Sequence, residues 1–195
     1  MKKKFALLTI ALVLVCAFCL VACNGYAQAL KDIQKLLKVD YSEIVLNVTT
    51  TTQGYTLNGN YTFTFEKGKT IVDYEYDKLN ELDVNGDNAD SYLTRVTGRA
   101  EIVDGKIVGS DVTLSFDIDF NGISFKEAFF ENYSVSETVF EADVANPKGF
   151  TGNNDLVCSN MRVKVLYSKS ALNIIQITYV SQKGAEISLS YSFTK

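Results

Sequence analysis

Residues 55–66 read YTLNGNYTFTFE, from Tyr55 to Glu66, and apolar or glycine positions alternate with polar ones throughout. A period of two is typical of a β-strand with one face buried and the other in solvent, as in an antiparallel sheet. The next strand, Thr70–Leu79, carries its apolar residues at even rather than odd positions, and the two-residue turn Lys67-Gly68 accounts for the change. The expected register pairs Phe63 with Val72, Tyr61 with Tyr74 and Gly59 with Tyr76.

The same alternation predicts seven further strands along the chain. They lie at Glu43–Thr52, Tyr92–Val103, Val108–Phe120, Val135–Val144, Leu156–Tyr167, Ala171–Gln182 and Glu186–Thr194. A three-residue turn, Val103-Asp104-Gly105, would set Val96 opposite Val112 and Tyr92 opposite Phe116. Three-residue loops at 168–170 and 182–184 would keep odd-numbered residues of the last three strands on the buried face.

Two segments have helical signals. Apolar residues recur at helical spacing from Tyr26 to Lys38, which predicts an amphipathic helix that covers the sheet. Its mixed polar face, with Lys31, Asp32, Lys35 and Lys38, argues against a helix that lies on a bilayer. The capping box Ser124-Phe125-Lys126-Glu127 predicts a short helix at about Phe125–Asn132. The segment from Asn146 to Asp155 is expected to be a break and a loop.

The expected fold class is therefore mainly β, within the α+β class. It consists of a single curved antiparallel sheet or half-open barrel of about nine strands, with an N-terminal amphipathic helix and a short inserted helix. Residues 23–195 form one domain.

Acidic residues cluster on the solvent face of the strand Thr70–Leu79, at Asp73, Glu75 and Asp77. They could be read as a carboxylate cluster for metal binding or acid–base chemistry. If the following loop centres on Gly86, however, Asp77 faces Arg95 and Asp73 faces Arg99. Cross-strand ion pairs are the simpler interpretation.

The loop itself begins with alternating oxygen ligands that resemble an EF-hand calcium loop, namely Asp83, Asn85 and Asp87. The glycine, Gly86, is at loop position 4 rather than 6, and position 12 is Thr94 rather than Glu. Asn-Gly between acids is also ordinary turn chemistry, so calcium is only a weak candidate here and no metal site is predicted.

Composition excludes several kinds of chemistry. The chain has no His and no Trp, which removes a His-based triad, a His zinc site and the commonest general base. We expect no cofactor and no enzymatic activity. A hydrolase built on Asp117 and Asp119 is the weakest hypothesis, because both lie on a solvent-facing strand surface without an evident pocket.

The N-terminal 22 residues have the pattern of a secretory signal: three lysines, an apolar run from Phe5 to Leu20 and small residues before a break. The sequence Leu20-Val21-Ala22-Cys23 resembles the lipobox of bacterial lipoproteins. That resemblance implies that residues 1–22 are removed and that Cys23 receives lipid. The protein would then be held at the extracytoplasmic face of a bacterial cell membrane. An ordinary cleaved signal or an uncleaved signal anchor is the alternative.

Removal of the signal changes the charge and the cysteine count. Three of the 19 basic residues leave, and the remaining 16 against 23 acidic residues give a net charge of −7. An acidic domain is not expected to bind nucleic acid. Cys16 and Cys19 leave with the signal and Cys23 carries lipid, so Cys158 has no disulfide partner and is expected to be a partly buried thiol.

The order of elements, a helix followed by a meander of strands, resembles the half-open barrel of LolA-like lipoprotein carriers and lipid-binding lipoproteins. The resemblance is architectural and implies an apolar cavity between sheet and helices. Eight aromatic residues of the expected inner face would line it: Tyr55, Tyr61, Phe63, Tyr74, Tyr76, Tyr92, Phe116 and Phe120. Alternatively, these residues fill a packed core. The expected function is non-enzymatic binding of an apolar or lipid-like ligand, and the alternative is a structural or protein-interaction subunit of the cell envelope with an unidentified protein partner.

Overall fold

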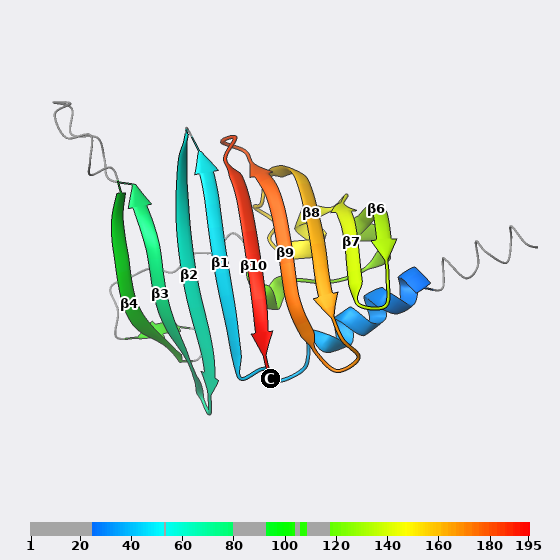
Figure 1. Ribbon diagram of the computed structural model, residues 1–195, viewed down its shortest axis with the longest axis horizontal. Helices are drawn as coiled ribbons and strands as arrows, with labels where there is room; N and C mark the ends of the chain where they lie inside the picture. Colours follow the sequence, from blue (N-terminus) through cyan, green and yellow to red (C-terminus); the bar gives the residue numbers. More distant parts are fainter. Residues whose placement is uncertain (1–24, 53, 80–92, 104–105, 109–117) are drawn as a thin grey trace, which may run out of the picture.

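Ten β-strands form one open antiparallel sheet in the computed structural model (Figure 1). The structure describes residues 25–52, 54–79, 93–103, 106–108 and 118–195. The strands are β1 (Glu43–Thr52), β2 (Tyr55–Glu66), β3 (Lys69–Leu79), β4 (Leu93–Val103), β5 (Lys106–Val108), β6 (Phe130–Val135), β7 (Val139–Val144), β8 (Cys158–Tyr167), β9 (Leu172–Ser181) and β10 (Glu186–Thr194). Their order is β5-β4-β3-β2-β1-β10-β9-β8-β7-β6, so the first and last strands pair at the centre.

The predicted hairpin register is confirmed. Tyr61 lies opposite Tyr74, and Phe63 and Gly59 lie opposite Val72 and Tyr76. β3 and β4 also pair as expected, with Asp77 opposite Arg95. The three-residue loop at 182–184 is confirmed by the backbone bond from the Ser181 N–H to the Ala185 carbonyl.

Pairing between β4 and β5 differs from the prediction. Ile102 lies opposite Ile107 and Val103 opposite Lys106, which leaves two residues in the turn instead of three. The expected strand Val108–Phe120 also ends differently, because Phe120 belongs to a 3₁₀ turn, η1 (Phe120–Gly122). Asp119 caps this turn by accepting a hydrogen bond from the Asn121 N–H at 3.0 Å. Val112 and the other expected partners at 109–117 lie outside the described residues.

The N-terminal helix spans residues 25–36 and lies across one end of β7–β9 (Figure 1). The expected apolar stripe is buried, and Ile33 is fully buried against the inner face of the sheet. We call this helix-covered face the inner face. The core here combines helix residues with Val165 and Ile175 of β8 and β9, so the helix is stabilised mainly by burial of its apolar face.

The expected helix at about Phe125–Asn132 is wrong. Only a 3₁₀ turn forms, η2 (Glu127–Phe129), and the chain then enters β6. Strand pairing opposes the helix, because the backbone groups of β6 bond to β7. The Phe125 N–H donates to Gln34 Oε1 at 2.7 Å, which ties the start of this segment to the N-terminal helix. The expected single strand Val135–Val144 instead contains the end of β6, the turn and the whole of β7, and the strand count is ten.

A short helix occupies part of the segment that was expected to be a loop. It is α2 (Pro147–Thr151), with Asn146 as its N-cap and Gly152 in the left-handed region at its end (φ +70°). Gly152 packs against Gly122 of η1, where an added Cβ would lie 2.4 Å from the Thr151 carbonyl oxygen. This close backbone approach fixes α2 against η1, and a side chain at position 122 would separate them.

Two buried tyrosine hydroxyls join segments that are distant in sequence. The Tyr41 hydroxyl donates to the Leu36 carbonyl and accepts from the Leu172 N–H, both at 2.9 Å. The Tyr191 hydroxyl donates to the Ile118 carbonyl at 2.8 Å. Burial raises the pKa of both hydroxyls above its usual value.

These tyrosines predict alkaline instability. Below about pH 10 the tyrosines stay protonated in the folded and unfolded chains, so their contribution to stability is fully present. As the pH rises above about 10, the unfolded chain loses tyrosine protons first and the free energy of unfolding falls. Between about pH 6 and pH 8 the absence of His should leave it nearly constant.

Urea unfolding at a series of pH values measures this dependence. The Tyr191→Phe variant is the control, since it lacks one of the buried hydroxyls and should lose stability less steeply above about pH 10. An unfolding free energy that stays constant into the alkaline range would contradict the prediction.

Candidate functional site

Three tyrosines form a continuous surface on the inner face of β2 and β3, which we call the tyrosine face (Tyr61, Tyr74 and Tyr76). The alternation of the two strands places them there, and Leu46 of β1, opposite Tyr61, connects the surface to the core. The Tyr61 and Tyr76 rings are stacked with centroids 6.3 Å apart and planes at 15°. Tyr74 and Tyr76 are 6.1 Å apart and tilted by 34°.

Two glycines make room for these rings. A Cβ added at Gly98 of β4 would lie 2.3 Å from the Tyr74 hydroxyl oxygen, so this ring lies across the β4 backbone. A Cβ added at Gly59 would lie 2.8 Å from Cε2 of Tyr61. Glycine in a strand interior often marks such a close approach of other groups to the backbone. The absence of a side chain at these two positions therefore leaves room for the Tyr74 and Tyr61 rings to lie close to the backbone.

Exposure varies across the tyrosine face. Tyr74 is buried, whereas Tyr61 and Tyr76 are half-buried. Burial raises the pKa of the Tyr61 hydroxyl, and the nearby Tyr76 hydroxyl raises it further. The surface therefore offers aromatic contact area and hydroxyl groups. Such a surface is suited to contact with an apolar or amphipathic molecule.

The other aromatic candidates lie in different places. Phe63 is partly buried against the core, and Tyr55 is exposed at the start of β2. Phe120 packs in the other half of the molecule, with its centroid 5.2 Å from that of Phe193. Tyr92 and Phe116 lie outside the described residues.

The space between the N-terminal helix and the sheet is filled by side chains, including Ile33 and Phe140, which are fully buried.

Several predicted sites fall outside the described residues. These are the lipobox Leu20-Val21-Ala22 with Cys23, the loop residues Asp83, Asn85 and Asp87, and Asp117. Among the residues that the structure describes, no group of three or more acidic, Cys or His side chains could hold a metal ion. Cys158 is half-buried, and burial raises the pKa of its thiol, which disfavours the reactive thiolate.

The expected ion pairs are confirmed on the outer face. Arg95 lies 2.6 Å from both Asp77 and Glu75, and Arg99 lies 3.7 Å from Asp73. Hydrogen bonds from Arg95 and from the Asn58 N–H lower the pKa of Asp77. The carboxylates of β3 therefore form cross-strand ion pairs, which are common on a solvent-facing strand surface.

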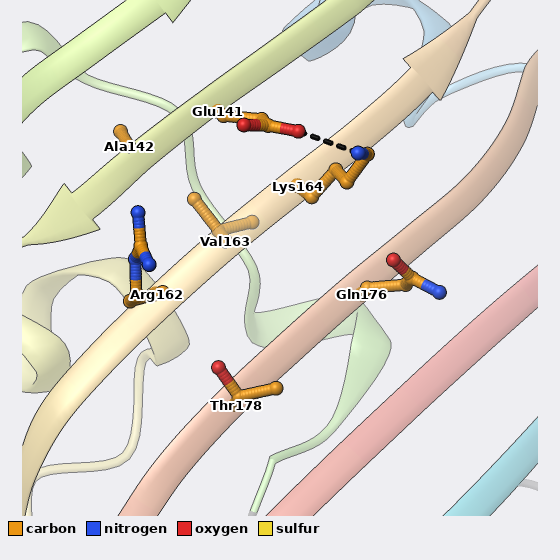
Figure 2. A pocket seen from close by; sticks show the side chains of 7 residues that line it. All are labelled: Glu141, Ala142, Arg162, Val163, Lys164, Gln176 and Thr178. Carbon is orange, nitrogen blue, oxygen red and sulfur yellow. Dashed lines mark ion pairs between the residues drawn. The ribbon is translucent and has the colours of Figure 1, made fainter.

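A second set of cross-strand pairs surrounds a shallow hollow on the outer face of β7–β9, with Glu141 pointing toward Lys164 (Figure 2). Arg162 Nε also lies 2.9 Å from Asp143 Oδ1. Both basic side chains are substantially exposed, so each pair contributes little to stability. The hollow is lined by paired charges, Gln176 and Thr178, which is typical of a solvated sheet face.

Sequence reasoning placed the tyrosines on one face but missed the role of the glycines. Gly59 and Gly98 were expected on the inner face, where a glycine among large side chains indicates that a ring can lie over it. No helix in the described part of the chain has the length and apolar character needed to span a membrane.

Comparison with known proteins identifies no family. No family model matches the chain, and no curated protein matches it. It has a weak similarity to the dehydratase domain from the terminal module of the rifamycin polyketide synthase, with 13% identity, 78% of this chain and 74% of that chain covered, and a TM-score of 0.20. An N-terminal dehydratase from the difficidin assembly line has 9% identity, 84% coverage of both chains and a TM-score of 0.17. Similarities this weak carry no conclusion about fold or activity.

Proposed function

We propose that the chain is a lipid-anchored lipoprotein of the bacterial cell envelope that binds an apolar or lipid-like ligand without enzymatic turnover. The observation that carries the ligand proposal is the tyrosine face, because two of its rings are half-exposed on a rigid sheet and two glycines leave room for the Tyr74 and Tyr61 rings. Tyrosine supplies a large contact area at a low cost in conformational entropy. The hydroxyl groups would orient the polar end of such a ligand.

The anchoring proposal is supported by the sequence of the first 23 residues. A basic start, an apolar run and the lipobox-like Leu20-Val21-Ala22-Cys23 occur together and in order. Acyl chains on Cys23 would hold the domain at the extracytoplasmic membrane surface, because each buried methylene contributes about 0.8 kcal/mol.

A protein-interaction role is the alternative, and one observation favours it. Strand β6 is an edge of the sheet and exposes Tyr133 and Val135, which are 43% and 37% accessible. Exposed edge strands can accept a strand from a partner. The ladder is interrupted between Glu131 and Ser134, where Asn132 adopts φ +46°, and this irregularity limits the length of edge that a partner could pair with.

Binding of a fluorescent fatty acid, 11-(dansylamino)undecanoic acid, tests the ligand proposal. We expect saturable binding to the wild-type protein and an affinity about tenfold lower for Tyr76→Ser, since a central aromatic side chain commonly contributes more than 1 kcal/mol to binding. Tyr133→Ser is the comparison variant for the β6 edge at the opposite end of the sheet, and it also removes the ring stacked on Tyr26.

Circular dichroism should show that both variants keep the fold. Equal affinities for wild type and Tyr76→Ser, or probe fluorescence that never saturates, would refute ligand binding at the tyrosine face. Loss of binding in Tyr133→Ser but not in Tyr76→Ser would move the site to the β6 edge.

A further inference from the structure

A hollow of about 310 Å³ lies between the N-terminal helix and η2, remote from the tyrosine face. Its floor is apolar, because Leu30 and Phe125 are buried beneath it, and Ala27 adds a small side chain beside them. Its rim is polar and includes Lys31, Lys35, Gln34 and Glu127. We call this feature the helix hollow. The rim carries two lysines and one carboxylate, so its net charge is positive, and with the apolar floor it matches an amphipathic molecule that has a negatively charged head.

The cationic rim is available for binding. Lys31 and Lys35 are one helical turn apart and both exposed, so they lie on the same side of the helix. Lys31 forms no ion pair with any described residue, and Lys35 makes only a long contact with Asp32, at 3.8 Å. The Gln34 side-chain oxygen accepts from the Phe125 N–H at 2.7 Å. This bond holds the Gln34 amide at the hollow with its NH₂ group free of any described partner.

One wall of the helix hollow lies near the proposed lipid attachment site in the sequence, which makes the membrane the source of its ligand. The described part of the helix starts at Gly25, two residues after Cys23 in the sequence, and Tyr26 stacks on Tyr133 of β6 with ring centroids 3.8 Å apart. At 1.5 Å per residue, Lys31 lies only about 9 Å along the helix from Gly25. Lys35 lies about 15 Å along the helix, and both long side chains could extend toward a membrane that holds Cys23.

The charge distribution of the domain also favours the helix hollow as the surface that contacts an anionic membrane. The domain after residue 22 has a net charge of −7, so an anionic bilayer repels most of it. The helix has a mixed polar face and is not expected to lie along the bilayer, but the two lysines at the hollow would be attracted to an anionic membrane surface. We propose that the helix hollow seats the phosphate headgroup of an anionic membrane phospholipid, with Lys31 and Lys35 on the phosphate and the glycerol region over Leu30 and Phe125. This inference rests on the proposed membrane anchoring and deepens it.

Amine footprinting of the full-length protein purified from membranes tests the inference. The protein is reconstituted into vesicles of phosphatidylcholine alone and of equal parts phosphatidylcholine and phosphatidylglycerol, and lysine acetylation is followed by mass spectrometry. We expect acetylation of Lys31 and Lys35 to slow about fivefold in the anionic vesicles. Lys183, exposed in the β9–β10 turn, is the internal control and should keep its rate.

Vesicle flotation separates this inference from the anchoring proposal. If the protein floats with both vesicle types and Lys31 and Lys35 react equally in each, the headgroup site is refuted and anchoring stands. Equal slowing at Lys183 would also refute the site, because protection would then be general. If the protein does not float at all, both the anchoring and the headgroup site are overturned.

Discussion

The Cys23→Ala variant is expected to lose all incorporation of a palmitate analogue during growth. Alanine has no sulfur to form the thioether that the lipobox resemblance implies, so no diacylglyceryl group can be added. The wild-type chain should carry the label and begin at Cys23, with residues 1–22 removed. Metabolic labelling with an alkyne fatty acid, followed by intact mass measurement, checks both expectations.

Cys158→Ala is the matched control for this experiment. Cys158 is a half-buried thiol of the folded domain, and its replacement should leave labelling unchanged. Label that persists in Cys23→Ala, or that disappears in Cys158→Ala, would show that Cys23 is not the acceptor. A mature protein that begins elsewhere would favour an ordinary secretory signal.

The Phe150→Ala variant is expected to be less stable by about 3–5 kcal/mol. Phe150 is fully buried on α2, and its ring lies 5.4 Å from the rings of both Phe125 and Phe130 in edge-on geometry. Truncation leaves a cavity and removes two aromatic contacts, each of which contributes about 0.5–1.5 kcal/mol beyond burial. Since small domains have a total stability of about 5–15 kcal/mol, a large part of it would be lost.

Chemical denaturation followed by circular dichroism measures this effect as a lower midpoint with an unchanged slope. Phe65→Ala is the control, because Phe65 is 44% exposed at the end of β2 and its removal should cost much less. Similar losses in the two variants would mean that α2 does not contribute to the core in the way its buried ring indicates.

The strands could be predicted because their side chains alternate and their turns fix the register. The pairing of Tyr61 with Tyr74 follows from a switch between odd and even positions across a two-residue turn. The same reasoning failed at β4 and β5. Even-numbered residues are expected on the inner face of both strands, and this requires a turn with an odd number of residues. The observed pairing sets Ile107 opposite Ile102 and leaves two residues in the turn.

Where the predicted secondary structure is wrong, contacts with distant parts of the chain determine which element forms. A capping box at Ser124 suggested a helix, but strand pairing of Phe130 with Val144 competes for the same backbone groups. The helix α2 had readable signals in Asn146 as N-cap, Pro147 at the first turn and Gly152 beyond the end. The same residues also mark turns, which is why the sequence predicts a loop here. The tyrosine face was predicted as a set of inner-face aromatics, but the glycines beneath its rings were recognised only from the structure.

The pairing of β1 with β10 at the centre of the sheet has a consequence for the order of folding. Glu43 lies opposite Thr194, so the middle of the sheet cannot close until the last strand has been synthesised. Contacts between residues so distant in sequence slow folding, because the entropy of closing the long intervening loop must be lost before the contacts form. The hairpin of β2 and β3 can form from local contacts, whereas the two halves of the sheet join only when the C-terminal end of the chain is available.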